Sequence, residues 1–237
     1  MIRLNLQMFG GRGASSSAGG SRGGYSVKTV MTQGGQEVHL TNPLVYGKDD
    51  PYLTGESRRK MEDFENRKAN AKIEWGYILD KDGNVVTEHK GGRGAVSFTY
   101  NQLAQAKQLS HIHPRGKGQE GYLGGTFSGA DTNSWVKNTN ITTMRAKANE
   151  GTYSISKGKN FDSQGFLKYR KEQSAINTAK KEATKKQLAT QYYKDKDYNK
   201  YVSGVQQAFN DFLVDEHNSL LKGAKTYGYN YTLERKK

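Results

Sequence analysis

Two histidines one residue apart, His111 and His113, are the residues of this chain whose types and spacing best suit chemistry. Side chains alternate along a strand, so two imidazoles on an extended segment would point to the same face. Pro114 follows directly and would end such a strand. Downstream, Ser128 and Asp131 have the spacing of a helix start, from which a carboxylate could reach the two rings. Two histidines and one carboxylate suit an open zinc site, in which the fourth position is left for water.

Each half of this pattern also has a plain structural interpretation. Ser128 could simply be the N-cap of a helix, with Asp131 placed favourably against the helix dipole. His111 and His113 could equally belong to the polar face of a strand, because histidine has other roles besides metal binding. The order of all the parts, His-x-His, proline, spacer and Ser-x-x-Asp, favours the metal site.

The same residues resemble the signature of the JAB/MPN (JAMM) family of zinc hydrolases, which has an upstream glutamate, then His-x-His-Pro, a spacer and Ser-x-x-Asp. The resemblance implies that His111, His113 and Asp131 bind Zn²⁺. It also implies that Ser128 helps to stabilise the oxyanion and that Glu74 is the general base. Zinc in such a site activates water at neutral pH. The implied activity is therefore hydrolysis of an amide or isopeptide bond in a peptide or protein substrate.

The upstream glutamate is chosen by its position in the predicted secondary structure. Glu74 opens a predicted strand at 73–79 and is soon followed by Gly76, as is usual in the family, although this Glu-to-Gly spacing departs from the standard one. Glu65 and Glu88 are the alternative carboxylates. Glu88 lies at the end of a predicted strand rather than at its start, so Glu74 is the preferred base.

The spacer departs from the family pattern. Residues 115 through 127 separate Pro114 from Ser128, and this is longer than the spacer usual in the family. The insert is rich in glycine, and it is predicted to form a mobile flap over the site, since such loops often carry substrate contacts. A long flap would leave the geometry of the metal ligands intact. It weakens the inference that this chain acts on a substrate class known for the family.

The elements predicted around these residues indicate an α+β or mixed α/β fold, which suits the cytidine-deaminase-like three-layer core of that family. An Asp-Gly turn at 82–83 between apolar β-forming runs predicts a hairpin. Hydrophobic periodicity predicts further strands and helices. The strands are at 95–98, 109–113, 142–146, 152–155 and a closing strand at 229–233; the helices are at 57–67, at 101–107 and from Ser128 onward. The JAB-like domain is expected to span residues 50–237.

The C-terminal third is predicted to add a helical extension at about 160–223, with Gly223 as its C-cap. From Ser156 onward, 17 lysines and arginines face 9 aspartates and glutamates, a surplus of 8 within the net charge of +14. Lysines on a helix are usually a solvated face, but such runs also attract nucleic-acid phosphates without reading sequence. Weak non-specific contact with nucleic acid is therefore one predicted interaction.

Residues 1–49 are predicted to form a flexible tail, rich in Gly, Ser and Arg at 10–24. Asn5 and Gln7 interrupt the apolar residues of the first nine, so no secretion signal is predicted. The opening resembles those of phage-encoded head-region proteins, which implies a phage- or mobile-element-encoded protein in the host cytoplasm or on the virion. The second function class follows from this: a head-associated structural or binding protein that keeps the JAB scaffold without required catalysis and has a head assembly partner.

Composition limits the remaining possibilities. The chain has 237 residues and an apolar content of 33%, with a mean hydropathy of −0.91, which predicts one modest core with extensions. Without cysteine, disulfides, thiolate zinc ligands and a thiol nucleophile are excluded. No apolar run approaches the length of a membrane span. His39, His89 and His217 have no companions at ligand spacing and are interpreted as ordinary histidines.

Overall fold

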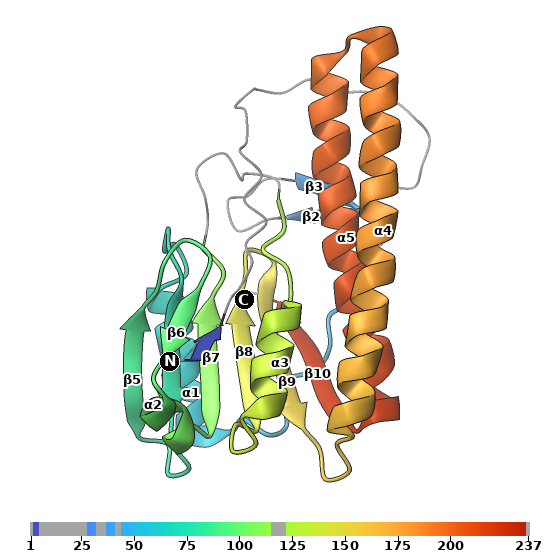
Figure 1. The fold of residues 1–237 in the computed structure, drawn as a ribbon. Coiled ribbons are helices and arrows are strands. Elements are labelled where there is room, and N and C mark those ends of the chain that lie inside the picture. The colour runs from blue at the N-terminus through green and yellow to red at the C-terminus, as the bar shows by residue number, and fades with distance from the viewer. Residues whose placement is uncertain (1, 5–27, 32–36, 41–43, 115–121, 236–237) are drawn as a thin grey trace.

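The computed structural model describes residues 2–4, 28–31, 37–40, 44–114 and 122–235 of the chain. They form a mixed α+β fold around a six-stranded sheet (Figure 1). In order across the sheet, its strands are β10 (Tyr229–Arg235), β9 (Gly151–Lys157), β8 (Thr143–Lys147), β7 (Gln108–Ile112), β4 (Trp75–Leu79) and β5 (Val85–Lys90). β7 and β8 run parallel, whereas the other neighbouring pairs of this sheet are antiparallel.

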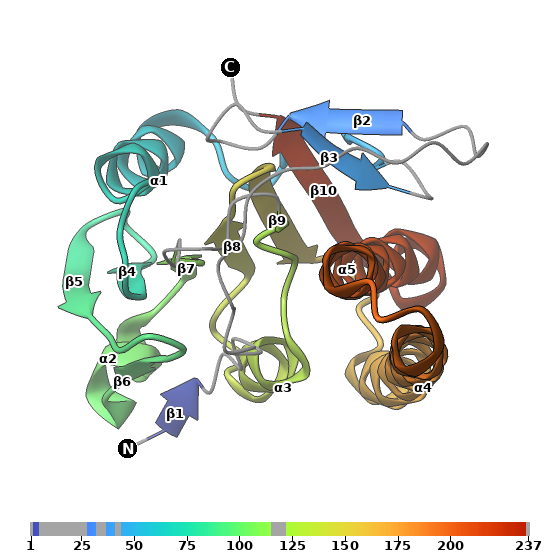
Figure 2. The same cartoon turned by 90° about the horizontal axis from the view of Figure 1, so that it is seen from above.

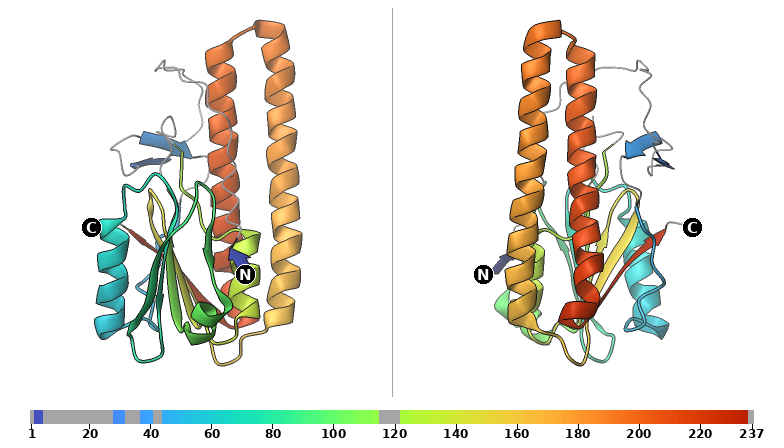
Figure 3. Two further views of the ribbon diagram at one scale, coloured as in Figure 1. Left: turned by 60° about the vertical axis from the view of Figure 1, so that its left-hand side comes forward. Right: turned by 90° about the vertical axis from the view of Figure 1, so that its right-hand side faces the viewer.

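Helices lie on both sides of the sheet (Figure 2). α1 (Gly55–Arg67) covers one face, and α2 (Tyr100–Gln105) and α3 (Gly129–Lys137) lie on the opposite side. α4 (Ser163–Asp195) and α5 (Tyr198–Tyr227) form an antiparallel pair that extends well beyond the sheet (Figure 3). None of the described helices combines the length and the apolar character that a bilayer crossing would need.

Two further pairs of short strands include residues that the sequence assigned to the tail. β1 (Ile2–Leu4) pairs antiparallel with β6 (Val96–Phe98), and β2 (Lys28–Met31) pairs antiparallel with β3 (Glu37–Leu40). The predicted flexible stretch at 10–24 lies outside the described residues.

Alternation of side chains along β7 divides the interior into two parts. Ser110 and Ile112 point to the α1 face, while Leu109 and His111 point to the opposite side. The α1 side holds a small apolar cluster made of Leu53, Met61, Phe64, Tyr77, Leu79 and Ile112. In it, the rings of Phe64 on α1 and Tyr77 on β4 stack at 4.8 Å between centroids, so this helix packs on the first strand of the sheet in chain order.

The larger core fills the opposite side and joins the sheet to the long helices. Trp135 of α3 meets Phe166 of α4 edge-on, with ring centroids 5.8 Å apart. Phe166 in turn meets Tyr229 of β10 at 5.0 Å. The sheet-proximal end of the helical pair is therefore fixed by the same core that supports α3.

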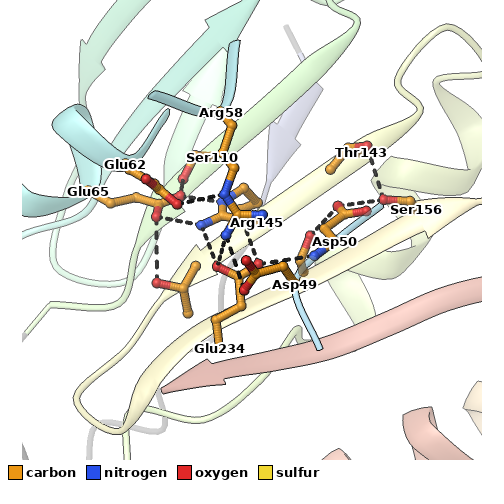
Figure 4. A network of polar contacts seen from close by, with 12 residues as sticks. Asp49, Asp50, Arg58, Glu62, Glu65, Ser110, Thr143, Arg145, Ser156 and Glu234 are labelled. Atoms are coloured by element: carbon orange, nitrogen blue, oxygen red, sulfur yellow. Dashed lines mark hydrogen bonds and ion pairs between the residues drawn. The ribbon is translucent and has the colours of Figure 1, made fainter. Parts of the chain in front are cut away.

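The rest of the α1 face is polar and carries a buried charge network (Figure 4). Arg145 of β8 donates to Glu65 of α1 from Nε at 2.7 Å and from Nη2 at 2.9 Å, and also contacts Glu234 of β10 at 3.1 Å. Ser110 donates to Glu65 at 2.8 Å, and Arg58 donates to Glu234 at 3.0 Å. The network therefore ties α1 to three strands of the sheet, β7, β8 and β10.

The predicted core elements are present with small shifts at their ends, and the expected α+β class is confirmed. One predicted boundary is wrong: Gly223 does not cap the helical extension. α5 continues to Tyr227, and Gly228, with φ of +69°, is the left-handed C-cap. Gly223 is a close-packing position instead, because a Cβ there would lie 2.7 Å from the ring of Tyr169.

His217 of α5 makes the stability of this fold depend on pH. It is fully buried, with Nδ1 2.8 Å from Tyr231 Oη and Nε2 2.9 Å from the Val45 carbonyl. Burial lowers the pKa of His217 from 6.5 to about 4, and the Val45 carbonyl offsets only part of this effect. Between these values the unfolded chain binds a proton that the folded chain does not. The contribution of neutral His217 to the free energy of unfolding is therefore complete above about pH 6.5. The free energy of unfolding falls by roughly 3 kcal/mol as the pH is lowered to about 4.

Urea unfolding at pH 7 and pH 4.5, in the wild type and in His217→Gln, would measure this dependence. The wild type should lose more unfolding free energy on acidification than the variant does, because the variant lacks the titrating ring. Equal losses in the two proteins would contradict the prediction.

Candidate metal centre

The histidine pair lies where β7 ends, at the side of the sheet that α3 covers. His111 is the fourth residue of β7 and is 1% exposed. His113 follows the strand and is held by a hydrogen bond from its backbone N–H to the Lys147 carbonyl at 2.8 Å. The two rings point to the same side, and their Nε2 atoms are 3.1 Å apart. The alternation predicted from the sequence is confirmed.

The start of α3 places the carboxylate. Ser128 is the N-cap: its Oγ accepts from the Asp131 N–H at 3.1 Å, and Asp131 Oδ2 accepts from the Ser128 N–H at 2.7 Å. This capping box fixes the carboxylate and leaves its second oxygen, Oδ1, buried and without a hydrogen-bond partner among the residues that the structure describes. The helix-start interpretation of Ser-x-x-Asp is therefore confirmed. It is compatible with the predicted metal-ligand role, because the helix cap also orients Asp131.

His113 is oriented by backbone carbonyls. Its Nδ1 lies 3.0 Å from the carbonyl of Gly124 and 2.9 Å from that of Gly125. Carbonyls only accept, so these partners assign the proton to Nδ1 and leave the Nε2 lone pair facing the cluster. This is the arrangement found in metal-binding histidines, where the second ring nitrogen donates to a carbonyl or carboxylate.

The geometry fits a single metal ion. One ligand atom from each of His111, His113 and Asp131 can be chosen so that all lie within 4.8 Å of one another. The two Nε2 atoms, 3.1 Å apart, are close to the roughly 3.3 Å between two nitrogen ligands of one tetrahedral zinc ion. The donor set, two imidazoles and one carboxylate, is that of an open zinc site.

Glu74 lies on the same face as His111 because of the strand register. Gly76 of β4 is paired with His111 of β7, and Glu74 is two residues before Gly76. Side chains two apart on a strand point to the same side. Gly76 leaves room there for Phe98 of β6, since a Cβ at this position would lie 2.2 Å from its ring. The Glu-x-Gly spacing thus has a physical reason.

Hydrogen bonds hold the backbone of Glu74 but not its carboxylate, as far as the described residues show. Its N–H donates to the Gly92 carbonyl at 2.7 Å, and its carbonyl accepts from the Gly91 N–H at 2.8 Å. The side chain is completely buried, and neither carboxylate oxygen has a hydrogen-bond partner in the described part of the chain. The Val96 backbone opposes, in small part, the rise that burial causes in the pKa of Glu74.

The other two candidate bases lie elsewhere. Glu65 points to the α1 face, where it pairs with Arg145. Glu88, near the end of β5, pairs with Arg67 and Lys68 at the surface. Of the three carboxylates weighed from the sequence, Glu74 is the one on the side of the sheet that carries the histidines.

Burial dominates the electrostatics of the cluster. Burial and the Asp131 carboxylate raise the pKa of Glu74 to about 9. Burial also raises the pKa of Asp131 to about 7, although the Ser128 hydrogen bonds and Arg170 oppose the rise. Burial lowers the pKa of His111 and of His113, so both rings are neutral, as metal ligands must be. A dication would complement all four groups.

Residues that the sequence did not single out support the cluster. Glu150, in the turn between β8 and β9, accepts from the N–H groups of Gly124 and Gly125. Arg170 of α4 reaches the Phe127 carbonyl just before α3, at 3.5 Å. No motif marks Glu150 or Arg170, because their partners are distant in the chain. The insert that separates Pro114 from Ser128 is described only from residue 122 onward, so its predicted role as a flap lies largely outside the described residues.

The predicted oxyanion role of Ser128 stays a prediction, since its observed contacts are those of a helix cap. Asp131 and the two histidines converge as expected, with Glu74 on their side of the sheet. Comparison of the chain with protein-family models, with curated proteins and with solved structures finds no match. The assignment of a metal centre therefore depends on the residues and geometry of this chain.

Proposed function

We propose that this protein is a zinc-dependent hydrolase of peptide or isopeptide bonds with a JAB-like fold. The observation that carries the proposal is the convergence of His111, His113 and Asp131, with Glu74 buried on the same side of the sheet. A sheet with α1 on one face and with α2 and α3 on the other agrees with the three-layer core that the resemblance implies.

Each residue has a distinct part in the proposed reaction. Zinc held by the three ligands would lower the pKa of a water molecule to near 7 and polarise the substrate carbonyl. Glu74 accepts the proton from the attacking water and passes it to the leaving amine. Ser128, at the N-terminus of α3, would help to stabilise negative charge on the carbonyl oxygen. Asp131 and the histidines hold their positions through the contacts described above.

A second candidate is a head-associated structural or binding role on the same scaffold. The α4–α5 pair supports it, because this pair projects beyond the sheet and leaves Ile176, Tyr193 and Tyr198 exposed (Figure 3). Such a protein would keep the cluster of His111, His113 and Asp131 but would not need Glu74 as a general base. Loss of function in a variant that changes only Glu74 separates the two candidates.

Metal content is the first test. Elemental analysis of the purified wild type should find about one zinc per chain, and the double variant His111→Ala/His113→Ala should bind none, because two of three protein ligands are removed. His89→Ala is the matched control, since this histidine is exposed and outside the cluster. Retention of stoichiometric zinc by the double variant would refute the site. Absence of zinc from the wild type even after incubation with the ion would favour the structural or binding role.

A further inference from the structure

We propose that Glu150 is a positioning residue of the metal centre, which sets the orientation of His113 through the backbone of Gly124 and Gly125. The inference rests on the proposed metal centre and adds to it a residue that touches none of the three ligands in the contacts described. Its consequence is that the affinity for zinc depends on a carboxylate in the turn between β8 and β9.

The contacts form a continuous chain. Glu150 Oε2 accepts from the Gly124 N–H at 2.8 Å, and Oε1 accepts from the Gly125 N–H at 2.8 Å. The carbonyls of the same two glycines accept from His113 Nδ1 at 3.0 and 2.9 Å. One carboxylate therefore fixes the peptide unit between Gly124 and Gly125, which is one of the two units that fix the ring.

A single peptide unit links the carboxylate to the imidazole. The Gly125 N–H that donates to Glu150 belongs to the same amide plane as the Gly124 carbonyl that accepts from His113. Hydrogen bonds in series polarise one another. Glu150 thus strengthens the acceptor opposite Nδ1 and makes the Nε2 lone pair a better ligand, since a carbonyl partner raises the basicity of a metal-binding histidine.

The glycines are required for this arrangement. Gly125 has φ of +80°, a region that disfavours side chains, and a Cβ there would lie 2.7 Å from Leu213 of α5. A Cβ on Gly124 would lie 2.8 Å from that of Ala148. The backbone is thus pressed between α5 and the end of β8, and this is what brings its carbonyls to His113.

α5 contributes to the same support. Asn210 Oδ1 accepts from the Leu123 N–H at 3.0 Å, one residue before the two glycines, and Leu213 packs on Gly125. Tyr153 of β9 donates to Glu150 at 2.5 Å and holds the carboxylate itself. Segments far apart in the chain therefore converge on the two glycines, so the long helical extension supports the metal centre.

The test is the zinc affinity of Glu150→Gln, measured by competition with a chromophoric chelator. Glutamine keeps the size of the side chain but turns an NH₂ group toward one of the two glycine amides. We expect the dissociation constant for zinc to rise about 10- to 100-fold, the range for loss of a partner that orients a ligand. Glu65→Gln is the matched control, because Glu65 is 2% exposed and Glu150 is 3% exposed, but Glu65 lies on the opposite face of the sheet. It should bind zinc as the wild type does.

A second readout needs no metal, and its first part needs no variant. Nitrogen-15 NMR of the metal-free wild type should show His113 with its proton on Nδ1, and in Glu150→Gln this tautomer should lose population. The opposite tautomer in the wild type would overturn the proposal even if the variant failed to fold. So would equal zinc affinity in the wild type and Glu150→Gln, or an equal loss in Glu65→Gln. Failure of the wild type to bind zinc would instead overturn the metal centre itself, and the inference with it.

Discussion

Glu74→Gln should abolish peptide hydrolysis while leaving zinc bound. The substitution removes the proton-accepting carboxylate and keeps the volume of a completely buried side chain. General base catalysis contributes typically about 10²- to 10⁴-fold to a rate, and this is the expected loss. Zinc should stay, because none of the three ligands is changed.

The loss is measured by the release of new amines from casein and from an ε-linked lysine isopeptide, with zinc content determined on the same preparations. Glu88→Gln is the control, since Glu88 was the competing candidate from the sequence and pairs with Arg67 at the surface. Its rate should equal that of the wild type. An unchanged rate in Glu74→Gln would show that another group accepts the proton.

Arg145→Met should cost about 3–5 kcal/mol of unfolding free energy, the range for breaking a buried ion pair by removing one partner. Burial alone would lower the pKa of Arg145, but the carboxylates of Glu65 and Glu234 outweigh it and raise this pKa. Glu65 is 2% exposed, so without the guanidinium its charge is left in the interior with Ser110 and Thr152 hydroxyls as its remaining partners. Glu234 is affected less, because Arg58 still contacts it.

Urea denaturation followed by tryptophan fluorescence measures this effect. The double variant Glu65→Leu/Arg145→Met tests its cause, because replacing a whole buried pair by apolar groups is often close to neutral. The double variant should therefore recover most of the stability that Arg145→Met loses. A double variant as unstable as the single one would show that the loss comes from packing and not from the stranded charge.

The short-range parts of this protein could be predicted from the sequence. The hairpin of β4 and β5, the histidines on one side of β7 and the helix start at Ser128 each depend on residues within a few positions of one another. Local patterns decide such elements, because strand alternation and helix capping act over two to four residues.

The long-range parts could not be predicted in this way. Arg145 meets Glu65 and Glu234 across 80 and 89 residues, and no periodicity marks such a partner. Glu150 was missed for the same reason. The prediction that Gly223 ends the helix was wrong, because a glycine near a helix end is normally a cap. Here the ring of Tyr169 requires the small size of Gly223.

Some of the 17 basic side chains of the C-terminal third are paired with acidic side chains of the long helices. Lys180 contacts Asp215 at 2.6 Å, Lys185 contacts Glu182 at 3.1 Å, and Lys200 contacts Asp195 at 3.4 Å. These exposed pairs contribute little to stability. They leave fewer lysines to attract phosphate than the sequence count indicates, and contact with nucleic acid stays a prediction.

The position of β10 after both long helices has a consequence for the order of folding. β9 pairs with β10, yet all of α4 and α5 must be synthesised before β10 leaves the ribosome. Helices form locally within microseconds, and their antiparallel packing shortens the effective loop between Lys157 and Tyr229. We therefore expect the helical hairpin to form first and to deliver the last strand to the sheet. Until then the nascent chain carries an unpaired strand edge at β9, which is the step most exposed to aggregation.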